Sequence, residues 1–262
     1  MKKVRVLVIR AAGTNCNTET AFAFKYAGAI PEEFHINSII KNPASFLVYH
    51  IIAIPGGFTY GDDVAPGKIL ANEIRFCLKE QIQKFVKNGK LVIGICNGFQ
   101  VLVKAGLLPA IEEKSIQQAT FTHNDSGKFE DRWVCLRPAK THCVWTKDIN
   151  DIIMLPVAHG EGKYVPLNKD ILSGHWKNKH IVFQYTDKNG EIQGYPSNPN
   201  GSVDSIAGVC DTTGRILGIM PHPERHIFSY NHPFWHRIKD LPKYGDGLKI
   251  FKNAVEYIKK HI

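Results

Sequence analysis

Residues 91–100 read LVIGICNGFQ and mark the point where a short apolar strand gives way to a helix. The spacing Gly94-x-Cys96-x-Gly98 is that of a nucleophile elbow, a sharp strand-to-helix turn that presents a reactive side chain. Glycine suits the two flanking positions because the turn brings neighbouring chain close to the nucleophile. The helix N-terminus beside Cys96 stabilises a thiolate. The stretch therefore predicts a cysteine nucleophile; the alternative is a buried core cysteine that follows a hydrophobic strand.

Strands and helices alternate around this turn. The sequence predicts strands over residues 4–9, 50–54 and 90–95 and helices over residues 19–27 and 69–86. Because these strands are continuously apolar, they predict a parallel sheet with helices on both faces. Shorter strands are predicted later, over residues 133–136, 152–154, 181–185, 205–209 and 216–219. We therefore expect a single α/β domain over residues 1–262, with three layers, a mostly parallel central sheet and a small antiparallel flap.

A histidine and a glutamate stand just after the last of these strands, where residues 220–225 read MPHPER. Pro223 favours extended backbone at His222, and in extended chain residues two apart point to the same side. Glu224 would then reach the ring of His222, fix its tautomer and stabilise the imidazolium. Together with Cys96 the two residues predict a Cys-His-Glu triad. The alternative is a turn that proline makes rigid and that carries surface charges.

A glycine-rich loop, IPGGFTYGDD at residues 54–63, follows another predicted strand. It matches neither of the common phosphate-binding glycine motifs. Acyl transfer creates an oxyanion, and one backbone N–H aimed at it lowers the barrier by ~3–4 kcal/mol. Gly57 in this loop and Asn97 after the nucleophile are the candidate donors. A plain turn is the alternative.

The composition is that of a folded globular protein, with 44% hydrophobic and 22% charged residues among 262. No apolar run approaches the ~18–20 residues of a membrane span, and residues 1–10 predict a first strand rather than a signal peptide. The net charge of +9 is dispersed and accompanies no nucleic-acid-binding module, so we expect neither nucleic acid nor membrane as a partner. Six cysteines without C-x-x-C spacing predict a cytoplasmic protein and no metal site.

Aromatic side chains gather between residues 226 and 246, ahead of a predicted closing helix. They are Phe228, Tyr230, Phe234 and Trp235. Large aromatic side chains contribute heavily to protein interfaces. We expect this stretch either to pack on the chain's own surface or to help dock a partner.

Several loops carry a resemblance that covers nearly the whole chain. They read AGTNC at 12–16, GFTYGD at 57–62, SGKFEDRW at 126–133 after Asn124, LPVAHGEG at 155–162, NPNGS at 198–202 and MPHPER at 220–225. With the elbow, they resemble class I glutamine amidotransferases, and among these the glutaminase subunits of phosphoribosylformylglycinamidine synthases of purine biosynthesis. The elbow points only to the superfamily, whereas the collected loops are specific to the purine-pathway members.

The resemblance implies that the chain hydrolyses glutamine to glutamate and ammonia. Cys96 would be the nucleophile, His222 the base and then the acid, and Glu224 the orienting carboxylate. Gly57 and Asn97 would be the oxyanion donors.

Two further places are implied to line the glutamine pocket. They are Gln100 and the segment that contains His159 and Glu161. For Gln100 the alternative is a side chain that only caps its helix, and for residues 159–162 the alternative is a simple turn.

The resemblance also implies a partner. Ammonia would pass to an ATP-dependent synthase subunit that makes formylglycinamidine ribonucleotide, with a small third subunit as a further member of the complex. We expect no cofactor in this chain, and we expect ATP and magnesium on the synthase subunit. Two rival functions remain: another cysteine hydrolase on the same core, such as a different amidotransferase or a peptidase, and a non-catalytic binding protein.

Overall fold

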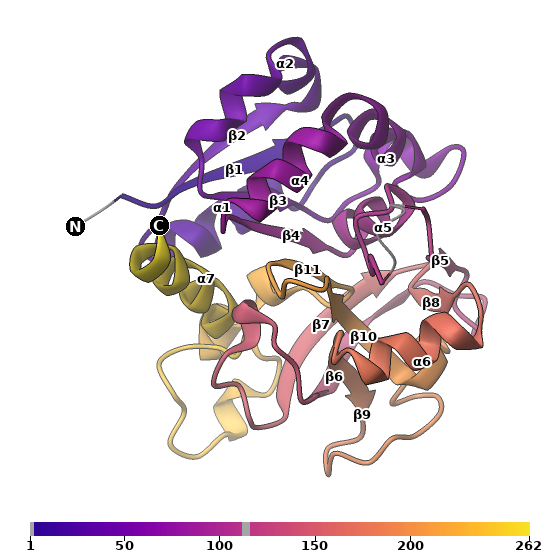
Figure 1. Ribbon diagram of the computed structural model, residues 1–262. Coiled ribbons are helices and arrows are strands. Elements are labelled where there is room, and N and C mark those ends of the chain that lie inside the picture. Colours follow the sequence, from indigo (N-terminus) through magenta and orange to yellow (C-terminus); the bar gives the residue numbers. More distant parts are fainter. Residues whose placement is uncertain (1–2, 112–115) are drawn as a thin grey trace.

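The computed structural model describes residues 3–111 and 116–262. A nine-stranded sheet runs through the molecule in the order β2-β1-β3-β4-β11-β10-β9-β6-β7 (Figure 1). Its strands are β1 (Arg5–Arg10), β2 (Ile30–His35), β3 (Ile51–Ile54), β4 (Leu91–Ile95), β6 (Glu130–Pro138), β7 (Ile153–His159), β9 (Ile181–Thr186), β10 (Ile206–Cys210) and β11 (Ile216–Ile219). The prediction of a single domain over residues 1–262 stays a prediction.

The half of the sheet from β2 to β11 is parallel. The neighbouring pairs β2–β1, β1–β3, β3–β4 and β4–β11 all run in the same direction. Every residue of β3, β4 and β11 is buried, as expected for strands that are covered on both faces. The apolar runs therefore predicted these strands correctly.

The other half of the sheet is antiparallel. The pairs β11–β10, β10–β9, β9–β6 and β6–β7 continue the same sheet rather than forming a separate unit. A small two-stranded antiparallel sheet, β5 (Ala119–Thr122) with β8 (Lys163–Pro166), lies beside it. The predicted α/β fold with added antiparallel strands is confirmed.

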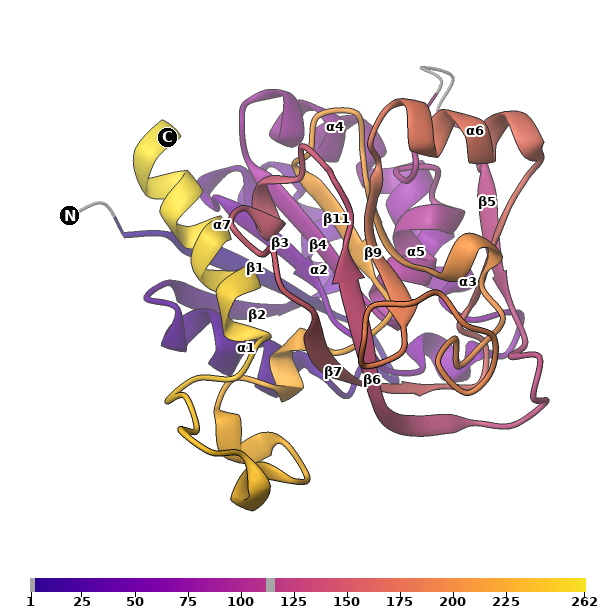
Figure 2. The same cartoon turned by 90° about the horizontal axis from the view of Figure 1, so that it is seen from below.

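Helices cover both faces of the parallel half. The helices are α1 (Asn17–Tyr26), α2 (Ile36–Lys41), α3 (Lys68–Glu73), α4 (Lys79–Lys87), α5 (Asn97–Lys104), α6 (Lys169–Lys177) and α7 (Leu248–His261). Helices α1 and α7 contact each other on one face, while α3, α4 and α5 lie on the other (Figure 2). Helix α6 lies elsewhere and contacts β8 of the small sheet. A wider, π-helical turn joins α3 to α4, so the helix predicted over residues 69–86 is present with an irregular centre. No helix in the two described ranges is long and apolar enough to cross a membrane.

The aromatic stretch after residue 226 contains two short 3-10 turns, Ser229–Asn231 and Trp235–Arg237, within otherwise irregular chain. The ring of Phe228 packs on the chain itself, with its centroid 4.8 Å from that of Tyr26 and 6.1 Å from that of Phe22. Phe234 and Trp235 are about half exposed. Part of the stretch therefore packs on its own surface, and a docking role for the exposed part stays a prediction.

Candidate active site

The three segments predicted to carry chemistry meet at one edge of the sheet. The glycine loop follows β3, Cys96 follows β4, and His222 comes three residues after β11. Because these neighbouring strands are parallel, their carboxyl ends lie together, which is where open α/β sheets bind ligands. The backbone N–H of Cys96 donates to Ile219 O at 2.8 Å and ties two of these strand ends together.

Cys96 lies in the strained turn that the glycine spacing predicted. Its φ of 52° and ψ of −107° place it in a region that residues with a side chain rarely adopt. A Cβ at Gly98 would lie 1.9 Å from Ile54 O, and a Cβ at Gly94 would lie 2.4 Å from Gly98 O. Both glycines are therefore required sterically, and the nucleophile-elbow geometry is present.

His222 and Glu224 form a buried pair. His222 Nδ1 lies 2.7 Å from Glu224 Oε1, and both side chains are almost completely excluded from solvent. The sequence argument expected extended chain here, but Glu224 instead lies in a 3-10 turn over Pro223–Arg225. The Arg225 N–H donates to His222 O at 3.2 Å and closes this turn. The pairing was therefore predicted correctly and the backbone that produces it was not.

Cys96 and His222 converge in front of Gly56. A Cβ added at Gly56 would lie 2.8 Å from His222 Cε1 and 3.3 Å from Cys96 Cβ, so this glycine leaves the space in which the two side chains meet. Burial by itself lowers the pKa of His222, but the Glu224 carboxylate and the Cys96 sulfur raise it well above its usual value. The arrangement therefore favours a protonated imidazole beside the Cys96 sulfur.

The two predicted oxyanion donors flank the nucleophile. Asn97 opens α5, where backbone N–H groups have no acceptor within the helix. Gly57 has a φ of +142°, and a Cβ there would lie 2.7 Å from Gly13 O. Within the described ranges, neither N–H donates to another backbone group. The Asn97 side chain ties the glycine loop to the helix, because its Oδ1 accepts from the Thr59 hydroxyl at 2.7 Å.

A cavity of about 220 Å³ opens beside Cys96. Its lining includes Gly57, Phe58, Cys96, Gln100, Phe129, His159 and Glu161. Gln100 is more than a helix cap, since its Nε2 donates to Glu161 O at 2.7 Å and so joins two walls of the cavity.

His159 has a different environment from the other pocket candidates. Its ring is buried, with Nδ1 3.1 Å from Asn124 Oδ1 and Nε2 3.4 Å from Asn200 Nδ2. Burial lowers the pKa of His159 to about 4, so the ring is neutral at pH 7. The side chain therefore holds the segment from His159 to Gly162 in place through its asparagine partners.

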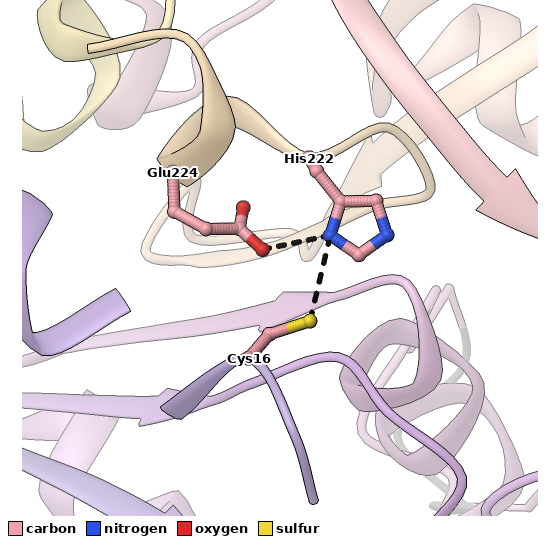
Figure 3. A group of neighbouring side chains, drawn as sticks. All are labelled: Cys16, His222 and Glu224. Atoms are coloured by element: carbon pink, nitrogen blue, oxygen red, sulfur yellow. Dashed lines mark hydrogen bonds and ion pairs between the residues drawn. The ribbon is translucent and has the colours of Figure 1, made fainter. Parts of the chain in front are cut away.

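Cys16 is the residue at this site that the sequence argument did not select. Its buried Sγ lies 4.0 Å from His222 Nδ1, on the ring edge that also faces Glu224 (Figure 3). Arg225 Nη2 donates to Cys16 Sγ at 3.2 Å, and Arg225 Nε donates to Glu19 at 2.9 Å. Burial raises the pKa of the Cys16 thiol. The signal in the sequence was the position of Cys16 at the end of one loop motif and of Arg225 at the end of another.

Comparison with known proteins decides the family. Residues 3–258 match the CobB/CobQ-like glutamine amidotransferase domain. A phosphoribosylformylglycinamidine synthase subunit PurQ from Dehalococcoides mccartyi is 47% identical over 263 residues, which cover 99% of this chain and 100% of the relative. The chain belongs to the PurQ family of glutamine amidotransferases.

Other PurQ proteins agree with this assignment. A PurQ subunit from Methanococcus maripaludis is 42% identical, with 98% of each chain covered. The solved structure of PurLQS from Thermotoga maritima superposes with a TM-score of 0.72 at 30% identity, covering 98% of this chain and all of that one. The resemblance to class I glutamine amidotransferases is therefore confirmed. The roles of the individual site residues stay predictions.

Proposed function

We propose that this chain is the glutaminase subunit of a phosphoribosylformylglycinamidine synthase. One observation carries the proposal: in a PurQ-family chain, Cys96 at the elbow and His222, which is paired with the buried Glu224, line one cavity. In this role the chain hydrolyses glutamine to glutamate and ammonia.

The first chemical step is attack by Cys96. The thiolate sulfur adds to the side-chain amide carbon of glutamine, and the carbonyl oxygen becomes an oxyanion. The backbone N–H groups of Gly57 and Asn97 are the proposed donors to that oxyanion, each worth ~3–4 kcal/mol of barrier lowering. This proposal is supported by the two N–H groups themselves, since neither donates to a backbone acceptor in the described parts of the chain.

The second step releases ammonia. Protonated His222 gives its Nε2 proton to the amide nitrogen, the carbon–nitrogen bond breaks, and a thioester to Cys96 remains. Glu224 accepts a hydrogen bond from Nδ1 and therefore keeps Nε2 directed at the reaction. His222 then takes a proton from water, which attacks the thioester and frees glutamate.

Gln100, His159 and Glu161 are proposed to shape the glutamine pocket. Gln100 and Glu161 are cross-linked across the cavity by the hydrogen bond from Nε2. His159 would act indirectly by fixing the backbone of its segment, because both ring nitrogens face asparagine side chains.

Ammonia must reach its acceptor without being lost, so the proposed chain works as part of a complex. We propose a synthase subunit as its partner and a small third subunit as a further member; the Thermotoga maritima relative is described as part of PurLQS. ATP and magnesium would then bind the synthase subunit. A cytoplasmic location is part of the proposal, supported by six free cysteines.

The test is to purify the chain with its synthase subunit from the same cells and to measure glutamate release and formylglycinamidine ribonucleotide formation together. We expect one glutamate for each ribonucleotide made. Cleavage of peptides without glutaminase activity would instead support the rival cysteine hydrolase. Retention of all cellular function by a Cys96→Ser variant would support the rival binding protein.

A further inference from the structure

A sulfur, a nitrogen and a carboxylate converge from two distant parts of the chain. Cys16 lies just before α1, while His222 and Glu224 follow β11 (Figure 3). One ligand atom from each residue lies within 4.8 Å of the other two, and the residues are 1%, 1% and 3% exposed. Cysteine sulfur, histidine nitrogen and carboxylate oxygen are the three ligand types that zinc uses in proteins.

A second observation points to a ligand at this place. Glu224 Oε2 is buried and has no hydrogen-bond partner among the described residues. Buried polar atoms without partners are rare and are commonly satisfied by water or an ion. Glu224 thus has Oε1 on the histidine ring and Oε2 without a partner, so its carboxylate keeps unused capacity to bind a cation.

From this convergence, we propose that Cys16, His222 and Glu224 form a zinc-binding site that turns the enzyme off. Ligand atoms of a tetrahedral zinc site are roughly 3.5 Å apart, given metal–ligand bonds of about 2.0–2.3 Å. The observed separations are 4.0 Å from Cys16 Sγ to His222 Nδ1 and 2.7 Å from Nδ1 to Glu224 Oε1. Side-chain shifts of about 1 Å therefore bring the three atoms around one ion.

Arg225 is the competitor of the ion. Its guanidinium donates to Cys16 Sγ at 3.2 Å and is held from its outer side by Glu19 at 2.9 Å. Arg225 and Glu19 are each about one-third exposed, so the arginine has solvent to move into. Zinc would replace the guanidinium as the positive charge beside Cys16 and Glu224.

The ion has a route to the site. A cavity of about 200 Å³ is lined by Asn15, Cys16, Cys96, His222 and Arg225, among others. An ion in this cavity would lie next to Cys96. With three protein ligands in place, its fourth coordination position would be open to water or to the Cys96 sulfur.

Zinc binding would stop proton transfer by His222, because the ion would fix which ring nitrogen carries the hydrogen. Zinc takes the lone pair of Nδ1, so the neutral ring carries its hydrogen on Nε2 and can no longer accept a proton there. Cys16 releases its thiol proton and His222 releases its Nδ1 proton to solvent when the ion binds. No electron is transferred, because zinc has no redox chemistry here. Binding itself is independent of the proposed function, whereas inhibition rests on it.

Cobalt(II) is the spectroscopic probe for the test, because a thiolate ligand gives it a near-ultraviolet charge-transfer band. We expect the full-length chain and its Cys96→Ser variant to show this band, and zinc to displace it. Cys16→Ser should lose the band and bind zinc at least about tenfold more weakly. Cys77→Ser, at an exposed cysteine, is the matched control and should behave like the unchanged chain.

Arg225→Gln should strengthen metal binding, whereas Cys16→Ser should weaken it. With the competing guanidinium removed, the cobalt band should appear at a severalfold lower metal concentration. A band that survives in Cys16→Ser and disappears in Cys96→Ser would overturn the proposal and place the metal on the nucleophile. Absence of a band in the unchanged chain would overturn it as well.

Two measurements keep the test sound if a variant folds poorly or if the proposed function fails. In the unchanged chain, zinc should protect Cys16 from alkylation, as read by peptide mass spectrometry, and unchanged labelling of Cys16 would contradict the site. A cobalt band in a chain that releases no glutamate would reject the proposed function and keep the metal site.

Discussion

His222 carries both proton transfers in the proposed reaction, whereas Glu224 only holds the ring and its charge. His222→Ala should therefore lower glutaminase turnover by at least ~10²–10⁴-fold, the usual worth of general acid–base catalysis. Glu224→Gln should leave measurable turnover and change KM for glutamine less than kcat. Since the two act as a unit through a 2.7 Å contact, the double variant should be little worse than His222→Ala alone.

The measurement is turnover of the single and double variants in the presence of the synthase subunit, with folding checked by circular dichroism. Nearly additive losses would mean that Glu224 is not the partner of His222. An unchanged rate in Glu224→Gln would lead to the same conclusion.

At the residue scale, local motifs predicted where these side chains lie, as far as neighbouring residues in the sequence determine their positions; their roles stay predictions. Cys96 and the His222–Glu224 pair each follow a strand directly or within a few residues, so short sequence patterns were sufficient. The contacts of Cys16 could not be predicted in this way. Its partners His222 and Arg225 are 206 and 209 residues away in the chain, and only the folded sheet brings them together.

The elbow between β4 and α5 depends on the absence of side chains at its glycines. Gly98→Ala would place a methyl group 1.9 Å from Ile54 O, which belongs to the backbone of β3 and cannot move without shifting the sheet. We expect this variant to lose about 1–3 kcal/mol of unfolding free energy, the usual cost of overpacking, together with its glutaminase activity.

Gly194→Ala is the matched control for this prediction, because nothing lies within 4 Å of the added methyl group. Urea denaturation of both variants and of the unchanged chain measures the loss of unfolding free energy. Equal midpoints for Gly98→Ala and the unchanged chain would show that the turn is not sterically constrained.

At the element scale, the strands that could be predicted from the sequence are those with a clear pattern of hydrophobic residues. The four central residues of β1 and all of β3 and β4 are buried and apolar, and the predictions of these strands were confirmed. Strand β2 was missed because its sequence, IPEEFH, lies at the sheet edge, carries two glutamates and a proline, and has no fully buried residue. An edge strand of this kind is determined by its pairing with β1, which no local pattern encodes.

At the scale of the whole molecule, burial makes several histidines of the described residues resist protonation, and the effect is largest at three of them. Burial lowers the pKa of His175 to about 3 and the pKa values of His159 and His180 to about 4. In the unfolded chain these groups titrate near ~6.5. As the pH falls from about 6.5 to 4, the unfolded chain therefore binds protons that the folded chain does not, and the unfolding free energy falls.

Within that pH window, each such histidine changes the unfolding free energy by at most ~1.4 kcal/mol per pH unit. Above about pH 6.5 the histidine is neutral in both states, and its effect no longer changes with pH. His175→Gln should therefore make the unfolding free energy less sensitive to acid. His236→Gln, at an exposed histidine, is the control and should leave the pH dependence unchanged. Urea denaturation at pH 7 and pH 5 measures both slopes, and identical slopes for His175→Gln and the unchanged chain would contradict the prediction.

The central claim is that Cys96 makes the ammonia that a separate synthase subunit uses. It is tested most directly by reconstituting the synthase with a Cys96→Ala chain and measuring ribonucleotide amination with glutamine and, separately, with ammonium. Loss of the thiol removes the only proposed route from glutamine to ammonia and leaves the synthase intact. We expect glutamine-dependent synthesis to disappear and ammonium-dependent synthesis to continue at the rate of the unchanged complex. Glutamine-dependent synthesis that persists in the Cys96→Ala complex would contradict the account.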